Sequence, residues 1–344
     1  MTTTLLRVSL LALLTISCTA PAAEVVTGLD VARPDVQEFI ASMAMQHGFD
    51  PAGITGVLRD AQTQPRILQL IQRPAERRLA WWEYRKQFVT EERIDGGVKV
   101  WQTHREELAR IADRSGVPAE YLVAITGVET SYGRNTGRYR VLDALATLGF
   151  DYPPRSEFFR RELEQFLLMT REDGVDPRMP LGSYAGAMGI AQFMPSSVRA
   201  YAVDDGQDGH RDLSEYGPDV FASIANYFVM HGWSAGQPVL AEINHGNPPD
   251  DPAAAKLALE DTLATLHARG YIFSSTMPED TPAMLVPAAL EQGMSWRVGY
   301  QNFYVITRYN RSTLYAMAVH ELAQAIAQRY HAAAVPVPVP VPGT

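Results

Sequence analysis

The stretch PAEYLVAITGVETSYG, residues 118–133, decides the fold. Pro118 suits the first turn of a helix, where its missing N–H is not needed. Gly133 is a good residue to end one, because glycine readily adopts the left-handed conformation that follows many helices. Apolar side chains recur on or near one face of the stretch: Leu122, Ile125 and Val128. The stretch therefore predicts a helix whose last turn carries Glu129.

Glu129 is the candidate catalytic residue. A carboxylate in the last turn faces the negative end of the helix dipole, and partial burial against Tyr132 or Phe193 would remove it from water. Both effects raise a carboxyl pKa. Cleavage of a glycosidic bond needs a carboxylic acid that is still protonated near neutral pH. A glutamate in such a helix is more often a solvated surface residue. The neighbouring motifs therefore decide whether Glu129 is catalytic.

The rest of the chain divides into a helical part and a part with strands. From residue 30 to about 233, apolar residues recur three and four apart between Gly/Pro breaks, which is typical of helices. After Trp233 the pattern favours short strands. The expected strands are 238–243, 283–290 and one or more within 295–308, with helices at 251–269 and 312–331.

The composition bounds the class of protein. The chain has 344 residues, 46% of them hydrophobic and 20% charged, so it can bury a core larger than one minimal domain. The formal net charge is −9 and no run of Lys and Arg occurs. Binding to nucleic acid by counterion release needs a basic face, so nucleic acid is excluded as a partner.

The N-terminus is typical of an export signal. Arg7 precedes an apolar run, 8–16, that is too short to span a bilayer. Ala20-Pro21-Ala22 fits an ordinary cleavage site after a signal of residues 1–22. Residues 15–18 resemble a lipobox in which Cys18, the only cysteine of the chain, would carry the lipid. We expect a periplasmic protein, with lipoprotein slightly favoured over soluble; the lipid would anchor it to the outer membrane.

Several motifs occur in a specific order, and together they identify a family. Residues 129–137 read ETSYGRNTG and continue as YRVLDALATL at 139–148. Asp151-Tyr152-Pro153, GAMGIAQFMPS at 186–196 and Tyr309-Asn310 follow. The chain resembles the membrane-bound lytic murein transglycosylase B family, glycoside hydrolase family 103, over nearly its whole mature length.

The resemblance implies a mainly α fold with a small β subdomain (α+β). A lysozyme-like core would span 109–233. A helical domain of 29–108 plus 311–333 and a small antiparallel sheet domain of 234–310 would flank it, the latter returning to the cleft. Residues 334–344, where Val and Pro alternate, would form an extended tail.

The resemblance also implies a lytic transglycosylase that acts on peptidoglycan glycan strands as a monomer, without a cofactor for the chemistry. Glu129 would protonate the leaving oxygen between N-acetylmuramic acid and N-acetylglucosamine. It would then take a proton from the O6 hydroxyl of the muramic acid, which closes a 1,6-anhydro ring. A positioned hydroxyl makes the second carboxylate of ordinary glycosidases dispensable. A hydrolytic muramidase or chitinase on the same fold, and a non-catalytic wall-binding protein, remain alternatives.

Further residues match the family's cleft positions. Gln192 can bond acetamido and hydroxyl groups, and Phe193 can pack on a sugar face. Arg155 lies on a locally basic segment that could meet carboxylates of the substrate, although Pro154 stands where the family has a second arginine. The other matching positions are Ser183, Tyr84, Tyr227, Tyr309, Asn310 and Tyr315.

Residues 204–210, DDGQDGH, resemble the start of an EF-hand-like calcium loop. Asp204 and Asp208 fall at the first and fifth positions, and the carbonyl of His210 at the seventh. The family resemblance adds Asp219 as a later ligand. Gly206 brings no oxygen to the third position, so a structural calcium site and a metal-free surface loop both remain open.

Overall fold

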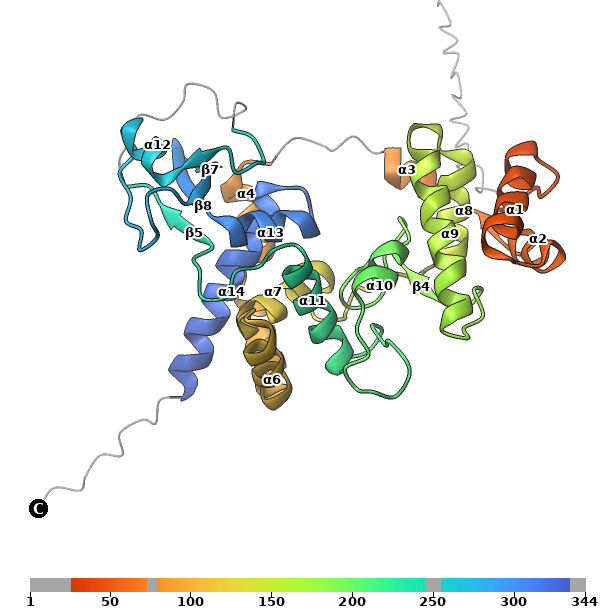
Figure 1. Cartoon of the computed structure of the whole chain (residues 1–344), viewed down its shortest axis with the longest axis horizontal. Coiled ribbons are helices and arrows are strands. Elements are labelled where there is room, and N and C mark those ends of the chain that lie inside the picture. Colours follow the sequence, from red (N-terminus) through yellow and green to blue (C-terminus); the bar gives the residue numbers. More distant parts are fainter. Residues whose placement is uncertain (1–25, 73–78, 245–254, 335–344) are drawn as a thin grey trace, which may run out of the picture.

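The computed structural model of the chain describes residues 26–72, 79–244 and 255–334. The expected signal with Cys18 and the expected Val/Pro tail lie outside these residues, apart from position 334. The described chain is mostly helical with small antiparallel sheets, which confirms the predicted fold class (Figure 1). No described helix is both long and apolar enough to cross a membrane.

The helices are α1 Pro34–His47, α2 Pro51–Arg59, α3 Pro65–Gln72, α4 Trp81–Phe88, α5 Glu91–Thr103, α6 Arg105–Ser115, α7 Ala119–Thr130, α8 Val141–Asp151, the 3-10 turn η1 Pro153–Arg155, α9 Ser156–Glu172, α10 Pro195–Tyr201, α11 Pro218–Met230, α12 Leu263–Ala268, α13 Gln301–Tyr309 and α14 Thr313–Ala334. The strands are β1 Thr27–Gly28, β2 Gln62–Thr63, β3 Tyr139–Arg140, β4 Leu181–Gly182, β5 Leu240–Glu242, β6 Asp261–Thr262, β7 Pro282–Ala289 and β8 Met294–Gly299.

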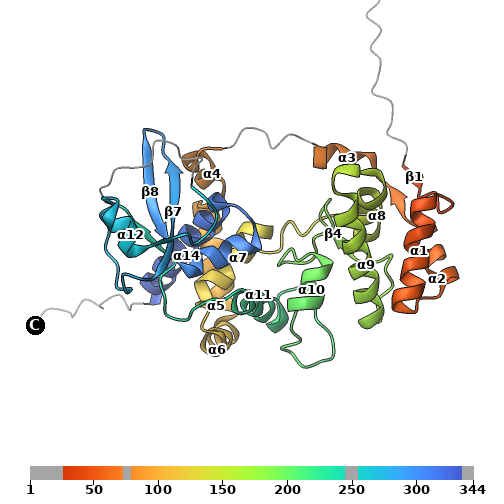
Figure 2. The ribbon, with the colours of Figure 1, turned by 45° about the horizontal axis from the view of Figure 1, so that its top comes forward.

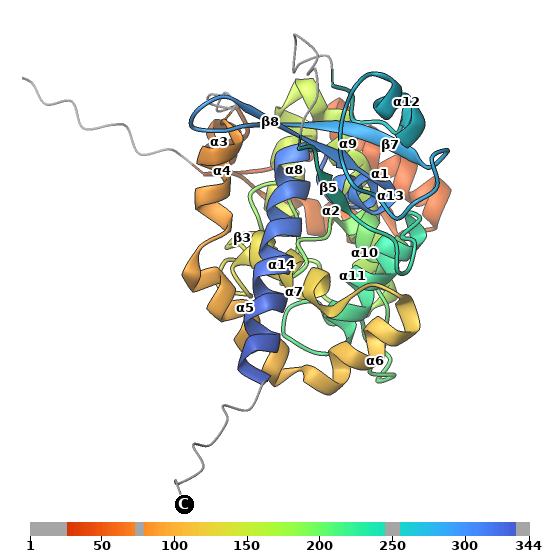
Figure 3. The same ribbon diagram turned by 90° about the vertical axis from the view of Figure 1, so that its left-hand side faces the viewer.

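The central helix is α7, which carries Glu129. Almost all of its residues are buried rather than only one face, because α5, α6, α11 and α14 all pack against it. Figure 3 shows α14 running alongside α5 and α7. A helix that is apolar on every side belongs in the centre of a core. The predicted helix is therefore confirmed, and it is more deeply placed than its sequence pattern indicates.

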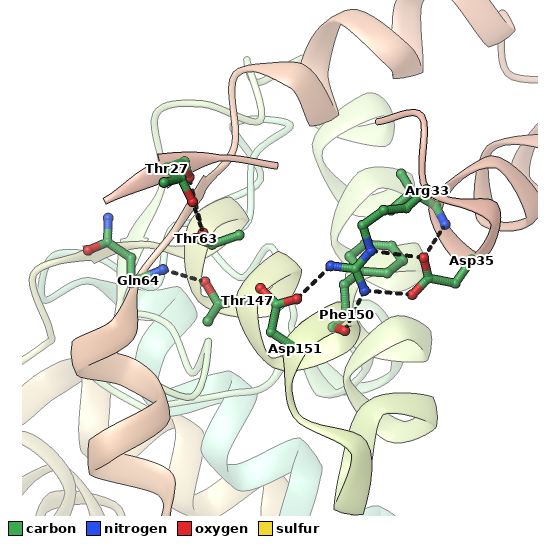
Figure 4. A network of polar contacts seen from close by, with 9 residues as sticks. Thr27, Arg33, Asp35, Thr63, Gln64, Thr147, Phe150 and Asp151 are labelled. Carbon is green, nitrogen blue, oxygen red and sulfur yellow. Dashed lines mark hydrogen bonds and ion pairs between the residues drawn. The ribbon is translucent and has the colours of Figure 1, made fainter. Parts of the chain in front are cut away.

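Residues 27–72 contain the first part of the expected domain 29–108 plus 311–333. They lie beside α8 and α9, whereas α4 and α5 lie beside α14 (Figure 2). The contacts are polar and specific (Figure 4). Arg33 donates to the Asp151 carboxylate at 2.6 Å, and the amide of Gln64 donates to the Thr147 hydroxyl at 3.0 Å. These contacts attach residues 27–72 to α8.

The larger sheet has the order β5-β8-β7-β6, and all its pairs are antiparallel. Strands were predicted within 295–308, but β8 ends at Gly299 and α13 follows. The segment is rich in β-branched and aromatic residues, yet burial of Phe303 and Ile306 on one helical face outweighs that preference. The helix expected at 251–269 is reduced to α12 in its described part, with β6 before it.

Candidate active site

The turn after α7 presents Glu129 at the end of a buried helix. Ser131 and Tyr132 both have left-handed backbone conformations, with φ of 52° and 64°. Their amides donate to the carbonyls of Gly127 and Thr126, which closes the helix end. Glu129 therefore lies in the last turn, as predicted, but Ser131 rather than Gly133 ends the helix. Two consecutive left-handed residues other than glycine are costly and are typical of functional sites.

The ring of Tyr132 holds this strained turn in place. It sits in a socket of three glycines, Gly96 and Gly97 of α5 and Gly127 of α7. A Cβ atom added to any of them would come within 2.7 Å of a Tyr132 ring or hydroxyl atom. The Tyr132 hydroxyl also donates to the Arg93 carbonyl at 2.5 Å. Only glycine allows this approach, so the socket fixes the position of the turn that presents Glu129.

The environment of Glu129 raises its pKa to about 7. The main cause is burial, which disfavours the charged form; the hydroxyl of Tyr315 donates a hydrogen bond to the carboxylate at 2.6 Å and lowers the pKa in part. The residue as a whole is only partly exposed. At neutral pH a large share of Glu129 is protonated, which suits a general acid.

Three of the predicted tyrosines lie close to Glu129. Its negative charge and their own burial raise the pKa of Tyr84 to about 12, and raise the pKa values of Tyr309 and Tyr315 well above the usual value. Tyr84 comes from α4, Tyr309 from α13 and Tyr315 from α14. All three remain neutral hydroxyl groups at physiological pH. Tyr315 donates its hydrogen bond to the acid, whereas Tyr309 donates to a backbone carbonyl.

An aromatic wall continues from Tyr309. The Phe193 ring lies 5.7 Å from both Tyr227 and Tyr309, centroid to centroid, and the two tyrosine rings lie 4.8 Å apart. The hydroxyls of Tyr309 and Tyr227 donate to the carbonyls of Ala191 and Arg308, each at 2.7 Å. Phe193 and Tyr227 are buried. These rings therefore support the site from behind more than they face solvent.

Ser183 and Gln192, the predicted polar binding residues of this segment, form side-chain hydrogen bonds with backbone groups. The Ser183 hydroxyl accepts from the amides of Ala185 and Ala187, and the Gln192 amide group donates to the carbonyls of Thr136 and Gly189. The carbonyl oxygen of the Gln192 side chain has no hydrogen-bond donor among the described residues. Gln192 also has a left-handed backbone, with φ of 51°. It is thus held rigidly, with one acceptor available.

Two further predicted binding residues, Arg155 and Asn310, have local partners other than the acid. The Arg155 guanidinium stacks on Phe158 and Phe159, 4.4 and 5.0 Å from their ring centroids, and has no hydrogen bond to Glu129 or its tyrosines within the described ranges. Asn310 is exposed directly after α13, and its backbone carbonyl accepts from the amide of Ser312. Its position next to Tyr309 keeps it at the edge of the site.

Sequence reasoning missed the parts that position Glu129. Arg93 of α5 donates to the Gly127 carbonyl, and burial lowers its pKa. The paired glycines Gly96 and Gly97, inside an otherwise amphipathic helix, were the available signal. Glycine in a helix interior is unfavourable unless another group needs the space.

The residues expected to bind calcium fold into a loop, but not into a ligand set. The Asp219 carboxylate accepts from the amides of Asp205 and Gly206 with one oxygen and from Asp212 with the other. Asp204 accepts from the amides of Asp208 and Gly209. Asp208 accepts from the amide of His210. In the described chain, no three acidic or histidine side chains converge so that they could hold a metal. In this conformation the three carboxylates of the loop are therefore hydrogen-bonded to backbone amides.

Comparison with known proteins agrees with this geometry. The family described as "Transglycosylase SLT domain" matches residues 32–324. Membrane-bound lytic murein transglycosylase B of Escherichia coli (strain K12) is 42% identical over 305 residues, which cover 86% of this chain and 83% of that protein.

Solved structures are similar throughout the fold. Soluble lytic transglycosylase SltB1 of Pseudomonas aeruginosa has a TM-score of 0.82 at 47% identity, covering 87% of this chain and all of that one. The Escherichia coli lytic transglycosylase Slt35, solved with bulgecin A and also with calcium, has a TM-score of 0.81 at 41–42% identity over 89% of this chain and 97% of its own. The chain therefore belongs to the transglycosylase SLT domain family and is a lytic murein transglycosylase that acts on peptidoglycan.

Proposed function

We propose that Glu129 is the only side chain that exchanges protons with the reacting atoms. The observation that carries this proposal is the pKa of about 7, set by burial and moderated by the Tyr315 hydroxyl. Protonated Glu129 donates its proton to the glycosidic oxygen as the bond to the anomeric carbon breaks. The resulting carboxylate, again bonded to Tyr315, then removes the proton of the O6 hydroxyl as that oxygen attacks the anomeric carbon.

The surroundings of Glu129 support an intramolecular nucleophile. Among the described residues, the pKa of Glu129 responds to burial and to Tyr315, and to no second carboxylate. Glycosidases that hydrolyse their substrate use two carboxyl groups on either side of the bond. When the substrate supplies its own positioned hydroxyl, one acid/base suffices. The arrangement thus favours the anhydro product over hydrolysis.

The substrate strand is proposed to run along the neighbouring polar and aromatic residues. Tyr84 and Tyr309 offer a ring and a hydroxyl beside the acid, and Gln192 offers its free carbonyl oxygen. Asn310 and Ser183 would bond the acetamido and hydroxyl groups of flanking sugars. Arg155 with its stacked phenylalanines would shape the outer part of the cleft, and the buried Phe193 and Tyr227 would support its wall from behind. The complex of Slt35 with bulgecin A supports ligand binding by a protein of this fold.

A glutamine variant tests the role of Glu129. Glu129→Gln keeps the shape and the hydrogen-bonding capacity of the side chain but cannot transfer a proton. We expect it to bind purified sacculi like the wild type and to release no soluble anhydromuropeptides. Release at the wild-type rate would refute the assignment. Glu120→Gln, on the first turn of the same helix, is the matched control and should remain active.

We further propose a periplasmic location with a lipid on Cys18. The support is the signal-like N-terminus and the membrane-bound description of the Escherichia coli relative. Labelling of cells with a clickable palmitate tests it: the wild type should incorporate label and Cys18→Ser should not. Cleavage after Ala22 without label would contradict it.

A further inference from the structure

Arg297 of β8 is the only arginine or lysine that is buried in the described part of the chain. Its Nη2 donates to Oε1 of Glu321 on α14 at 2.9 Å, and its Nε lies 2.7 Å from Oε1 of Glu242 on β5. Its Nη1 donates to the sulfur of Met317, also on α14, at 3.0 Å. Burying a paired charge adds little stability compared with a well-packed apolar residue. What an arginine adds here is a fixed arrangement of its partners, because its planar guanidinium binds several of them at once.

The same guanidinium contacts α4. Its central carbon lies 5.4 Å from the ring centroid of Trp81, the first residue of that helix. The second carboxylate oxygen of Glu321 accepts from Nε of Arg85, so the Arg297–Glu321 pair is bonded to α4 at another point. Tyr84 lies between these two attachment points in the helix. The ion cluster of Arg85, Arg297 and Glu321 therefore joins α4 and α14 to β8.

α4 and α14 each carry a tyrosine that lies near Glu129. Tyr315 donates to the carboxylate at 2.6 Å, and the charge of Glu129 contributes to the raised pKa of Tyr84. With 3.6 residues per turn, Met317 and Glu321 lie about 200° and about 240° around α14 from Tyr315. Arg297 therefore holds α14 on a face away from the one that presents Tyr315 to the acid.

The charge of Arg297 is not among the causes that shift the pKa of Glu129, which are burial and the Tyr315 hydroxyl within the described structure. His320, next to Glu321, has a pKa lowered to about 4 by burial and by Arg297, so it is neutral at pH 7. The charged partners of Arg297 at neutral pH are thus the two glutamates above. Arg297 can influence the acid by holding the helices that carry the tyrosines.

We propose that Arg297 is a positioning residue for the transglycosylase reaction, which through Glu321 and Trp81 holds Tyr315 and Tyr84 in place beside Glu129. The inference rests on the proposed function, because it takes Glu129 as the acid/base. It makes the small sheet a part of the catalytic apparatus, since β8 carries the residue that fixes the geometry around the acid.

The test uses Arg297→Met, which removes the cation and keeps an apolar side chain. The measured quantities are kcat on soluble glycan strands and the pH above which kcat/KM falls. We expect kcat to drop about tenfold, because a displaced catalytic group loses its alignment. The pH of the fall should rise toward that of Tyr315→Phe, since a lengthened Tyr315–Glu129 bond lowers the pKa of Glu129 less. Arg297→Lys should recover only part of the loss, because an ammonium group cannot reproduce the planar contacts.

Arg329→Met is the matched control. Arg329 also lies on α14 and also pairs with two carboxylates, those of Glu91 and Asp95 at 2.6 Å each, but it is more exposed than Arg297 and farther from Tyr315. Exposed ion pairs contribute little, so this variant should keep kcat within about twofold and leave the pH profile unchanged.

A double variant separates positioning from a general structural role. In the Tyr315→Phe enzyme, Arg297→Met should cause no further change in the pH of the fall, because both act through the same hydrogen bond. The inference is overturned if Arg297→Met leaves kcat and the pH profile unchanged. A loss of kcat with an unchanged pH profile, or an equal pH shift with and without Tyr315, would overturn it as well.

Thermal melting shows which variants keep the fold. If Arg297→Met does not fold, Glu321→Gln gives the same comparison, because it keeps the shape of the side chain and weakens the same ion pair. Failure of the proposed function looks different. Glu129→Gln would then release anhydromuropeptides at the wild-type rate, whatever the Arg297 variants do.

Discussion

The hydroxyl of Tyr315 lies 2.6 Å from the carboxylate of Glu129 and donates its proton to it. The two residues are 186 positions apart in sequence, and α14 brings them together by packing against α7. This single bond stabilises the ionised form of an acid that burial otherwise keeps protonated. It therefore lowers the pKa of Glu129 and reduces the fraction of the acid that is protonated at a given pH.

Removing this bond should move the pH profile. Activity requires protonated Glu129 in the free enzyme, so kcat/KM should fall as the pH rises through about 7. Among the described residues, Tyr315 makes the one hydrogen bond that lowers the pKa of Glu129. In Tyr315→Phe the pH at which kcat/KM falls should therefore rise by about one pH unit, with reduced activity at the optimum. A fall that stays at the same pH, or moves to lower pH, would show that Tyr315 does not act on the acid.

Glu129 should also destabilise the folded protein at high pH. Its folded pKa of about 7 is above the ordinary glutamate value of 4.5. The folded state therefore binds the proton more tightly than the unfolded state, and stability falls as the pH rises from about 4.5 to about 7. Glu129→Gln should increase the free energy of unfolding by up to about 3 kcal/mol at pH 8, and leave it nearly unchanged at pH 4. Urea unfolding at both pH values measures the difference. Equal effects at the two pH values would contradict the assigned pKa.

The glycine socket of Tyr132 should be intolerant of any side chain. Gly127→Ala places a methyl group 2.7 Å from the Tyr132 hydroxyl oxygen. The ring has to move, and with it the turn after Glu129, so we expect a loss of about 1–3 kcal/mol in stability and at least tenfold in kcat. Gly56→Ala is the control, because an added Cβ there meets nothing within 4 Å; it should be neutral or stabilising. Equal stability and activity of the two variants would show that the socket does not position the turn after Glu129.

The 204–219 loop should fold without calcium. Three backbone amides bond to Asp219, and Arg110 and Arg114 each pair with Asp205 at 2.6 Å. Neither calcium nor a chelator should change the Tm, because a ligand raises the Tm only where it binds the folded state. Asp219→Ala should lower the free energy of unfolding by about 1–3 kcal/mol. A Tm that rises with calcium concentration would show that the folded protein binds calcium.

Sequence alone predicted the parts of the fold that depend on local pattern and ordered motifs. It predicted a helix at 118–130 with Glu129 in its last turn and an α14 close to its observed bounds, because helical periodicity and capping residues act over short distances. The tyrosines near the acid followed from the family motifs.

The rest depends on contacts between distant segments. The helix at 301–309 replaced an expected strand because burial of Phe303 outweighed local preference. The placement of residues 27–72 against α8 rests on side-chain partners such as Arg33 and Asp151. The Tyr132 socket joins α5 to α7. No local pattern encodes any of these.

The central claim is that Glu129 acts alone and that the O6 hydroxyl of the substrate replaces a second carboxylate. Mass spectrometry of muropeptides released from purified sacculi tests this most directly. We predict products lighter by one water than the hydrolysed muropeptides, with 1,6-anhydromuramic acid ends, from the wild type and none from Glu129→Gln. Products that carry the added water as hydrolysed reducing ends would contradict the account.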